Sequence, residues 1–241
     1  MAVSALGLVA ASPVLLPVMF LVWWKDKHSP FYVATRVGKD RRPFQMVKLR
    51  SMVVNADQSG VDSTSASDAR VTPIGLFVRR FKLDELTQLW NVLYGDMTMV
   101  GPRPNVKRET DLYTHAEQGL LSVRPGITDF ASIVFSDEGD ILKGHPDADI
   151  AYNQLIRPGK STLGLFYIER RSLWIDVQLC WWTAIAIVSR RRALDGLQRT
   201  LRRLEATPEI LMLAARREPL VPSPPPGSDH VVTSRERRSS L

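Results

Sequence analysis

The chain has very little cysteine and histidine, which excludes two kinds of site. Its 241 residues include one cysteine, Cys180, so no internal disulfide can form and nothing indicates an oxidising compartment. Cys180 lies in an apolar run beside Trp181 and Trp182, a setting typical of a small buried side chain. The four histidines are scattered without the spacing of metal ligands, so the sequence predicts no zinc site.

Charge is absent from residues 2–24, a run long enough to cross a bilayer as one straight helix. No positively charged segment precedes it, so a secretory signal is not predicted. Two interpretations stay open. The helix either spans the membrane or breaks at Ser12-Pro13 and leaves by the face it entered, because Pro13 and Pro17 both lack a backbone N–H. Ser12 can then hydrogen-bond the freed backbone. Residues typical of the membrane interface and its cytoplasmic side follow, namely Trp23, Trp24, Lys25 and Lys27.

Acidic residues are outnumbered, since 25 Asp and Glu face 32 Lys and Arg, for a net charge of +7. This balance suits an anionic partner such as nucleic acid, anionic lipid or a phosphorylated substrate. No interleaving of aromatic and basic residues and no helix-turn-helix pattern occurs, so nucleic acid is not the predicted partner. The arginine excess at residues 190–203 follows an apolar, tryptophan-rich run, which favours anionic lipid of the inner membrane.

Residues 81–104 are the most informative stretch. Apolar residues recur there at helical spacing, and Gly95 ends the predicted helix. Asp84 begins the opposite face, with Gln88 and Asn91, and Glu85 lies on its flank. Acids in a first helical turn are favoured by the helix dipole alone. The alternative is an anionic pair beside a cationic phosphate clamp on the Gly-Pro-Arg-Pro turn at residues 101–104.

Cations flank this stretch on both sides. Residues 31–37 and 43–52 read as two strands, and the second carries Lys48 and Arg50 on one face. These are either a solvated edge or contacts for a diphosphate. Arg79 and Arg80 precede the acids and are either surface charge or groups that keep the carboxylates ionised. Residues 55–68 are polar and predict a mobile loop over the site.

These segments resemble one family. The stretch from residue 83 to residue 104 is similar to the signature of the bacterial sugar transferases, monotopic phosphoglycosyl transferases, with Thr87 in place of Pro and Thr98 in place of Ser. Residues 44–52, 124–128 and 165–176 also resemble family segments. The chain departs from the pattern at Asp129, where Gly is usual, and at Gly164, where an acid is usual. Asp137, Glu138 and Glu169 are candidate replacements for that acid.

The resemblance implies a reaction and its residues. A UDP-sugar would donate its sugar phosphate to polyprenyl (undecaprenyl) phosphate, releasing UMP, with Asp84 as the nucleophile and Glu85 as the ligand of Mg²⁺. It also implies a re-entrant membrane helix, a site at the cytoplasmic face of the bacterial inner membrane, and a possible homodimer. The residues expected to bind substrate are Lys48, Arg50, Arg79, Arg103 and Arg124. The sugar and the pathway are not specified by the sequence.

The predicted fold is mixed α/β and mainly helical, in a membrane-associated monotopic chain. A re-entrant helix at 1–24 precedes a catalytic domain at 25–188, a basic amphipathic helical extension at 189–218 and a disordered tail at 219–241. Residues 177–188 are too short to span and are either an interfacial helix or a buried core helix. An inactive membrane scaffold of the same fold is the alternative function, supported by Asp129 and Gly164.

Overall fold

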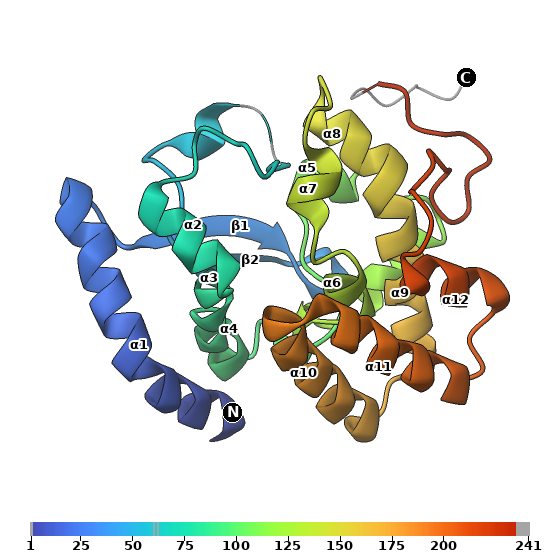
Figure 1. Ribbon diagram of the computed structural model, residues 1–241, viewed down its shortest axis with the longest axis horizontal. Coiled ribbons are helices and arrows are strands. Elements are labelled where there is room, and N and C mark those ends of the chain that lie inside the picture. The colour runs from blue at the N-terminus through green and yellow to red at the C-terminus, as the bar shows by residue number, and fades with distance from the viewer. Residues whose placement is uncertain (1, 60, 62, 235–241) are drawn as a thin grey trace.

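The computed structural model describes residues 2–59, 61 and 63–234, and within them the chain is mixed α/β and mostly helical (Figure 1). The strands are β1 (Phe31–Val37), β2 (Pro43–Leu49), β3 (Thr98–Val100) and β4 (Gly126–Thr128). The helices are α1 (Ala2–Asp26), α2 (Pro73–Arg80), α3 (Leu83–Leu86), α4 (Leu89–Tyr94), α5 (Lys107–Thr110), α6 (Phe130–Val134), α7 (Glu138–Leu142), α8 (Ala148–Ala151), α9 (Arg157–Arg170), α10 (Leu173–Val188), α11 (Arg190–Arg203) and α12 (Pro208–Ala215).

Helix α1 is bent and lies along one side of the molecule (Figure 1). Both prolines lie inside a continuous helix rather than at a break. The Ser12 hydroxyl donates to the Val9 carbonyl at 2.7 Å, the acceptor that Pro13 leaves without an N–H. Residues Ser4–Asp26 have a mean hydropathy of 2.3 and are long and apolar enough to cross a bilayer, by length and composition. The Ser12 hydrogen bond is thus confirmed.

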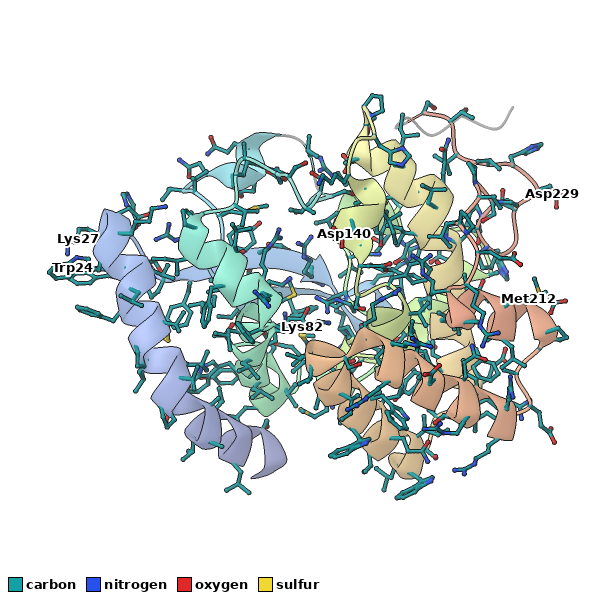
Figure 2. The ribbon with its side chains drawn as sticks, viewed as in Figure 1. Trp24, Lys27, Lys82, Asp140, Met212 and Asp229 are labelled. Atoms are coloured by element: carbon teal, nitrogen blue, oxygen red, sulfur yellow. The ribbon has the colours of Figure 1, made fainter. Side chains whose placement is uncertain are left out.

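The inner face of α1 forms a small core with the helices that carry the acids. Its buried side chains are Leu15, Val18 and Val22. They pack with Leu49, Val78 and Leu83 from β2, α2 and α3. At the end of α1, Trp24 and Lys27 point outward (Figure 2), and the Lys27 ammonium lies 3.7 Å from the Trp24 ring centroid. The apolar helix is therefore fixed to the acid-bearing segment by packing as well as by the chain.

The helix predicted through residues 83–93 is two short helices, α3 and α4, joined by Thr87 and Gln88 in right-handed helical conformation. Its polar face is buried against β2, which pairs with β1 in an antiparallel hairpin. The Asn91 amide donates to the Gln45 carbonyl at 2.6 Å and accepts from the Val47 N–H at 2.9 Å. Gly95 ends α4 at φ 88°, as predicted.

A larger core lies between α6, α9, α10, α11 and α12. Phe130, Leu163, Leu179 and Leu197 are fully buried at its centre. The parallel strands β3 and β4 pair Thr98 with Gly126 and Val100 with Thr128. This short ladder joins the chain that follows α4 to the segment that enters α6, so it sets the position of the turn at residues 101–104.

Helix α10 has one side buried in the core and an opposite side that is apolar but exposed. Ile175 and Leu179 are buried in the core. The other side exposes a set of large apolar residues, namely Leu173, Trp174, Val177, Trp181 and Val188. Helix α11 differs from the expectation of a membrane-bound amphipathic helix, because its apolar stripe is buried in the core and only its arginine face is exposed. Any contact of α11 with a bilayer is therefore electrostatic.

The segment that follows α12 differs from the predicted disordered tail. Residues 219–234 have no regular secondary structure but are hydrogen-bonded to the domain. The Gln154 side-chain amide donates to the Val232 carbonyl at 2.7 Å, and the Gln154 backbone carbonyl accepts from the Ser223 N–H. The Thr114 hydroxyl donates to the Pro226 carbonyl. These bonds hold the proline-rich chain against the surface. Residues 235–241 lie outside the described residues.

Candidate active site

A cavity of about 1070 Å³ opens between two groups of elements. One wall is formed by β2, α2, α3 and the turn at residues 101–104, and the other by α6, α7 and α9. Figure 2 labels one residue on each wall, Lys82 before α3 and Asp140 on α7. The acids predicted as the reactive pair line the first wall.

Asp84 and Glu85 occupy the first turn of α3, directly after a sharp turn of the chain. Lys82 has a left-handed backbone conformation (φ 53°, ψ 30°), which non-glycine residues rarely adopt. It separates α2 from α3, and Leu83 anchors the start of α3 in the small core against α1. With Leu83 held inward, the two following carboxylates reach the cavity. A residue held in this strained conformation is typical of functional sites.

Arg103 forms an ion pair with Glu85, with 2.7 Å between Nη1 and Oε1. The same nitrogen also donates to the Ile127 carbonyl at 3.3 Å. The turn that carries Arg103 is fixed by two backbone hydrogen bonds, from Gly101 to Thr128 at 2.9 Å and from Gly126 to Pro102 at 3.0 Å. The sequence-predicted acid and cation thus meet because β4 holds the turn in place.

The two acids have opposite protonation tendencies. Burial raises the pKa of Glu85, but Arg103, Lys82 and Lys48 outweigh it and lower that pKa to about 2. Burial raises the pKa of Asp84, with Glu85 adding to the increase and Lys48 opposing it. Neighbouring carboxylates whose environments separate their pKa values are typical of acid pairs with different roles. Glu85 is a permanent anion, and the ionisation of Asp84 depends on its cationic neighbours.

Lys48 is the cation whose own charge is most easily changed. Burial and the repulsion of Arg103 lower its pKa to about 8, although Asp84 and Glu85 favour the charged form. Its ammonium therefore loses its proton as pH rises through about 8, well below the pH at which an ordinary lysine does so.

The structure brings together most of the predicted site residues. Five of them line the cavity, namely Lys48, Arg79, Asp84, Glu85 and Arg103. Arg50 also lines it, but its guanidinium forms a bidentate pair with Asp26 at 2.6 and 2.7 Å and donates to the Ser29 carbonyl. Arg50 therefore fastens the end of α1 to β2. Arg124 is exposed and is not among the residues that line the cavity.

The acids proposed as replacements at Gly164 are separated by the fold. A Cβ at Gly164 would lie 2.8 Å from Leu120 Cδ2, so a larger side chain at this position requires the Leu120 side chain to move. Asp137 pairs with Arg190 and Arg216 and does not line the cavity, and Glu169 is exposed. Only Glu138 of the three lines it.

Sequence reasoning missed several charged groups of the cavity, among them Asp129 and Lys160. Asp129 is buried there and accepts 2.7 Å hydrogen bonds from the N–H and hydroxyl of Ser132, which cap α6. Lys160, on α9, pairs with Glu138 across the second wall. The departure from the family pattern was a signal for Asp129, whereas no local pattern marks Lys160. Within the residues that the structure describes, no group of three or more His, Cys, Asp or Glu is arranged to hold a metal ion.

Comparison with known proteins decides the family. The family model described as bacterial sugar transferase matches residues 1–190. The chain belongs to this family. A UDP-glucose:undecaprenyl-phosphate glucose-1-phosphate transferase from Klebsiella pneumoniae is 35% identical over 185 residues, covering 75% of this chain and 37% of the relative. A putative undecaprenyl-phosphate N-acetylgalactosaminyl 1-phosphate transferase from Bacillus subtilis is 42% identical over 125 residues, 52% of this chain and 66% of the relative.

A third relative of this sugar transferase is a UDP-N-acetylgalactosamine-undecaprenyl-phosphate N-acetylgalactosaminephosphotransferase from Aeromonas hydrophila. It is 32% identical over 181 residues, covering 74% of this chain and 40% of the relative. The matches to the Klebsiella and Aeromonas proteins span less than half of those proteins. The matched region of this chain includes the acids, the turn at residues 101–104 and α1.

Proposed function

We propose that this sugar transferase moves a sugar 1-phosphate from a UDP-sugar to undecaprenyl phosphate and releases UMP. The observation that carries the proposal is one cavity that holds Asp84, Glu85, Lys48 and Arg103, next to a bent apolar helix. The activities after which the Klebsiella and Aeromonas relatives are named support the same substrates. The cationic wall suits a diphosphate, and the apolar helix suits a lipid acceptor.

In the proposed mechanism Asp84 is the nucleophile. Its carboxylate oxygen attacks the phosphorus that bears the sugar, and the bond from this phosphorus to the bridging oxygen breaks, so UMP leaves with the electron pair. A phosphate oxygen of undecaprenyl phosphate then attacks the same phosphorus. The acyl-phosphate bond to Asp84 breaks, and the free carboxylate is regenerated with the lipid diphosphate sugar as product.

The neighbouring charges assist both displacements. Lys48 keeps Asp84 ionised against the effect of burial and contacts the donor phosphates as a point charge. Arg103 is held by Glu85 and donates its remaining N–H groups to the phosphate that departs. Because these groups are fixed before substrate arrives, little reorganisation is needed when charge develops on UMP.

The carboxylates fit a Mg²⁺ ion that arrives with the diphosphate. Mg²⁺ is commonly held by one or two protein carboxylates together with phosphate oxygens. Glu85 supplies an ionised carboxylate, since the pKa of this group is lowered to about 2, and Asp84 lies beside it. When bound, such an ion would neutralise phosphate charge and polarise the phosphoryl group.

The apolar surfaces of α1 and α10 support a proposal for the membrane placement. We propose that α1 enters the cytoplasmic face of the bacterial inner membrane and returns to it, with the bend at Ser12-Pro13 inside the bilayer. The exposed apolar side of α10, which includes Trp174 and Trp181, lies at the same interface, and the arginine face of α11 meets anionic lipid. The cavity is then reached by a soluble nucleotide and by the lipid headgroup.

The apparent KM for the UDP-sugar should rise as pH increases through about 8. Burial and Arg103 lower the pKa of Lys48 to about 8, so its charge is present below that pH and lost above it. A Lys48→Arg variant keeps its charge to a much higher pH, because the pKa of arginine exceeds 12. In this variant the rise in KM should therefore begin at a higher pH than in wild type. If the rise occurred at the same pH in both proteins, Lys48 would not be the group that causes it.

The proposed function is tested by UMP release from UDP-glucose and UDP-N-acetylgalactosamine, with Mg²⁺ and membranes that contain undecaprenyl phosphate. Formation of UMP together with a lipid-linked sugar supports it. An inactive scaffold would release no UMP from a broad panel of UDP-sugars. A protein recovered in the soluble fraction with bound nucleic acid would contradict both membrane interpretations.

A further inference from the structure

The second wall of the cavity carries an ion pair that the proposed chemistry does not use. Glu138 begins α7, and Lys160 lies in the first turn of α9, 22 residues further along the chain. The Lys160 ammonium donates to Glu138 Oε2. Both residues line the cavity, and their side chains keep 20% and 32% of their surface exposed, for Lys160 and Glu138 respectively. The pair is therefore reachable from the cavity.

Tyr152 completes this group. The Lys160 nitrogen lies 5.1 Å from the centroid of its ring, and Tyr152 also lines the cavity. Burial lowers the pKa of Lys160, but Glu138 outweighs it and raises that pKa to about 12. Glu138 is likewise ionised, because Lys160 lowers its pKa against the effect of burial. The cost of removing two charges from water offsets most of the attraction between them, so this ion pair contributes little net stability to the fold. Stability alone therefore does not explain its presence in the cavity wall.

The two walls differ in charge, so each suits a different part of a substrate. The first wall has a clear excess of cations, namely Lys48, Arg79, Arg80, Lys82 and Arg103. On the second wall the charge of Lys160 is compensated by Glu138, that of Arg157 is compensated by Glu117 at 2.6 Å, and the wall also carries the carboxyl groups of Asp129 and Asp140, so it has no excess of cations. A diphosphate is attracted to the first wall. The second wall suits a neutral group with many hydroxyls, because Glu138 accepts hydrogen bonds and Lys160 donates them.

The cations of the first wall and the Glu138–Lys160 pair of the second wall line the same cavity, so one substrate can contact both. Arg103 contributes to the electrostatic environment of both Glu138 and Lys160, and Lys48 contributes to that of Glu138. A cavity of about 1070 Å³ that includes both walls has room for a nucleotide sugar.

We propose that Glu138 and Lys160, with the ring of Tyr152, form the subsite for the sugar of the donor and determine which sugar the enzyme accepts. This inference rests on the proposed function, since it assigns the sugar end of a UDP-sugar to the second wall. Glu138 accepts from sugar hydroxyls, Lys160 donates to them, and the Tyr152 ring covers an apolar face of the sugar. Loss of one such charged hydrogen bond weakens binding by about 10-fold or more.

The test compares a ligand with the sugar to one without it. Full-length protein in detergent is titrated with UDP-glucose, with UDP-N-acetylgalactosamine and with UDP, in wild type, Glu138→Gln and Lys160→Met. We expect the Kd of the better UDP-sugar to rise by about 10-fold or more in both variants, while the Kd of UDP changes by less than about 2-fold. Asp137→Asn is the matched control, because it makes the same change at an adjacent ion-paired acid outside the cavity and should leave all Kd values unchanged.

Each outcome has a separate meaning. Equal weakening of UDP and UDP-sugar in Glu138→Gln would overturn the subsite, because the pair would then support the wall or bind the nucleotide. A wild-type protein that binds UDP no more weakly than either UDP-sugar would also overturn it. Wild-type protein that binds UDP-sugar but releases no UMP would instead contradict the proposed function. Circular dichroism spectra that match wild type show that each variant is folded.

Discussion

Replacement of Asp84 by asparagine is expected to lower UMP release by about 10³-fold or more, since loss of a covalent nucleophile removes the reaction path itself. Asparagine has nearly the same shape, so the packing of α3 should be kept. Burial raises the pKa of Asp84, so a neutral amide there removes a charge that the fold disfavours. We therefore expect thermal stability equal to or above that of wild type together with the loss of turnover.

The same variant tests the covalent intermediate directly. Wild-type protein incubated with a UDP-sugar labelled at the sugar-linked phosphorus, without acceptor lipid, should retain label after denaturation. Asp84→Asn should retain none. The control is Asp195→Asn, which changes an exposed acid on α11 that does not line the cavity and should leave labelling intact. A labelled Asp84→Asn protein would show that another residue is the nucleophile.

Replacement of Gly126 by alanine is expected to destabilise the fold by about 3 kcal/mol and to lower activity by about 100-fold. A Cβ at Gly126 would lie 2.0 Å from the Gly101 nitrogen and 2.6 Å from its Cα and carbonyl oxygen. These are backbone atoms, so β3 and β4 must separate. That movement breaks the hydrogen bonds of Gly101 and Gly126 and displaces Arg103 from Glu85.

The effect is measured by urea unfolding in detergent and by the rate of UMP release. Gly95→Ala provides the comparison, because Gly95 has φ 88° but no atom within 4 Å of its Cβ position. Gly95→Ala should lower the free energy of unfolding only by the cost of a left-handed alanine, about 1–2 kcal/mol, and should leave kcat near that of wild type. If Gly126→Ala lost no more stability than Gly95→Ala, the close approach of the two strands would not hold the turn.

Several features of the site were predictable because they depend on residues that are near one another in the chain. The adjacent acids Asp84 and Glu85, the end of α4 at Gly95 and the hydrogen bond from Ser12 all follow from spacing within one or two helical turns. The cationic turn at Arg103, 18 residues after Glu85, was predictable too, but the ion pair between them depends on β4, which holds that turn in place. Local conformational preferences are enough to place such groups.

Other features were not predictable, because a charged residue takes whichever partner the fold brings near. Lys48 and Arg50 are two residues apart and were expected on the same face of one strand. In the structure Arg50 is bound to Asp26 of α1, and Lys48 is the one of the two that lies near the acids. The polar face of α3 and α4 was expected opposite the apolar stripe, and it is buried because Asn91 hydrogen-bonds the backbone of β2. Helix α11 is amphipathic in sequence, but its leucines are buried in the core against α10 and α12.

The sequence by itself determined the family, the acid pair and the apolar helix, since each is a property of consecutive or closely spaced residues. Only the tertiary structure decided which cations meet the acids, that Leu120 packs against Gly164, and that Glu138 and Lys160 pair on a second wall of the cavity. The physical reason is that a cavity is made by packing elements distant in the chain, and the free energy of that packing is shared among many side chains that no single motif contains.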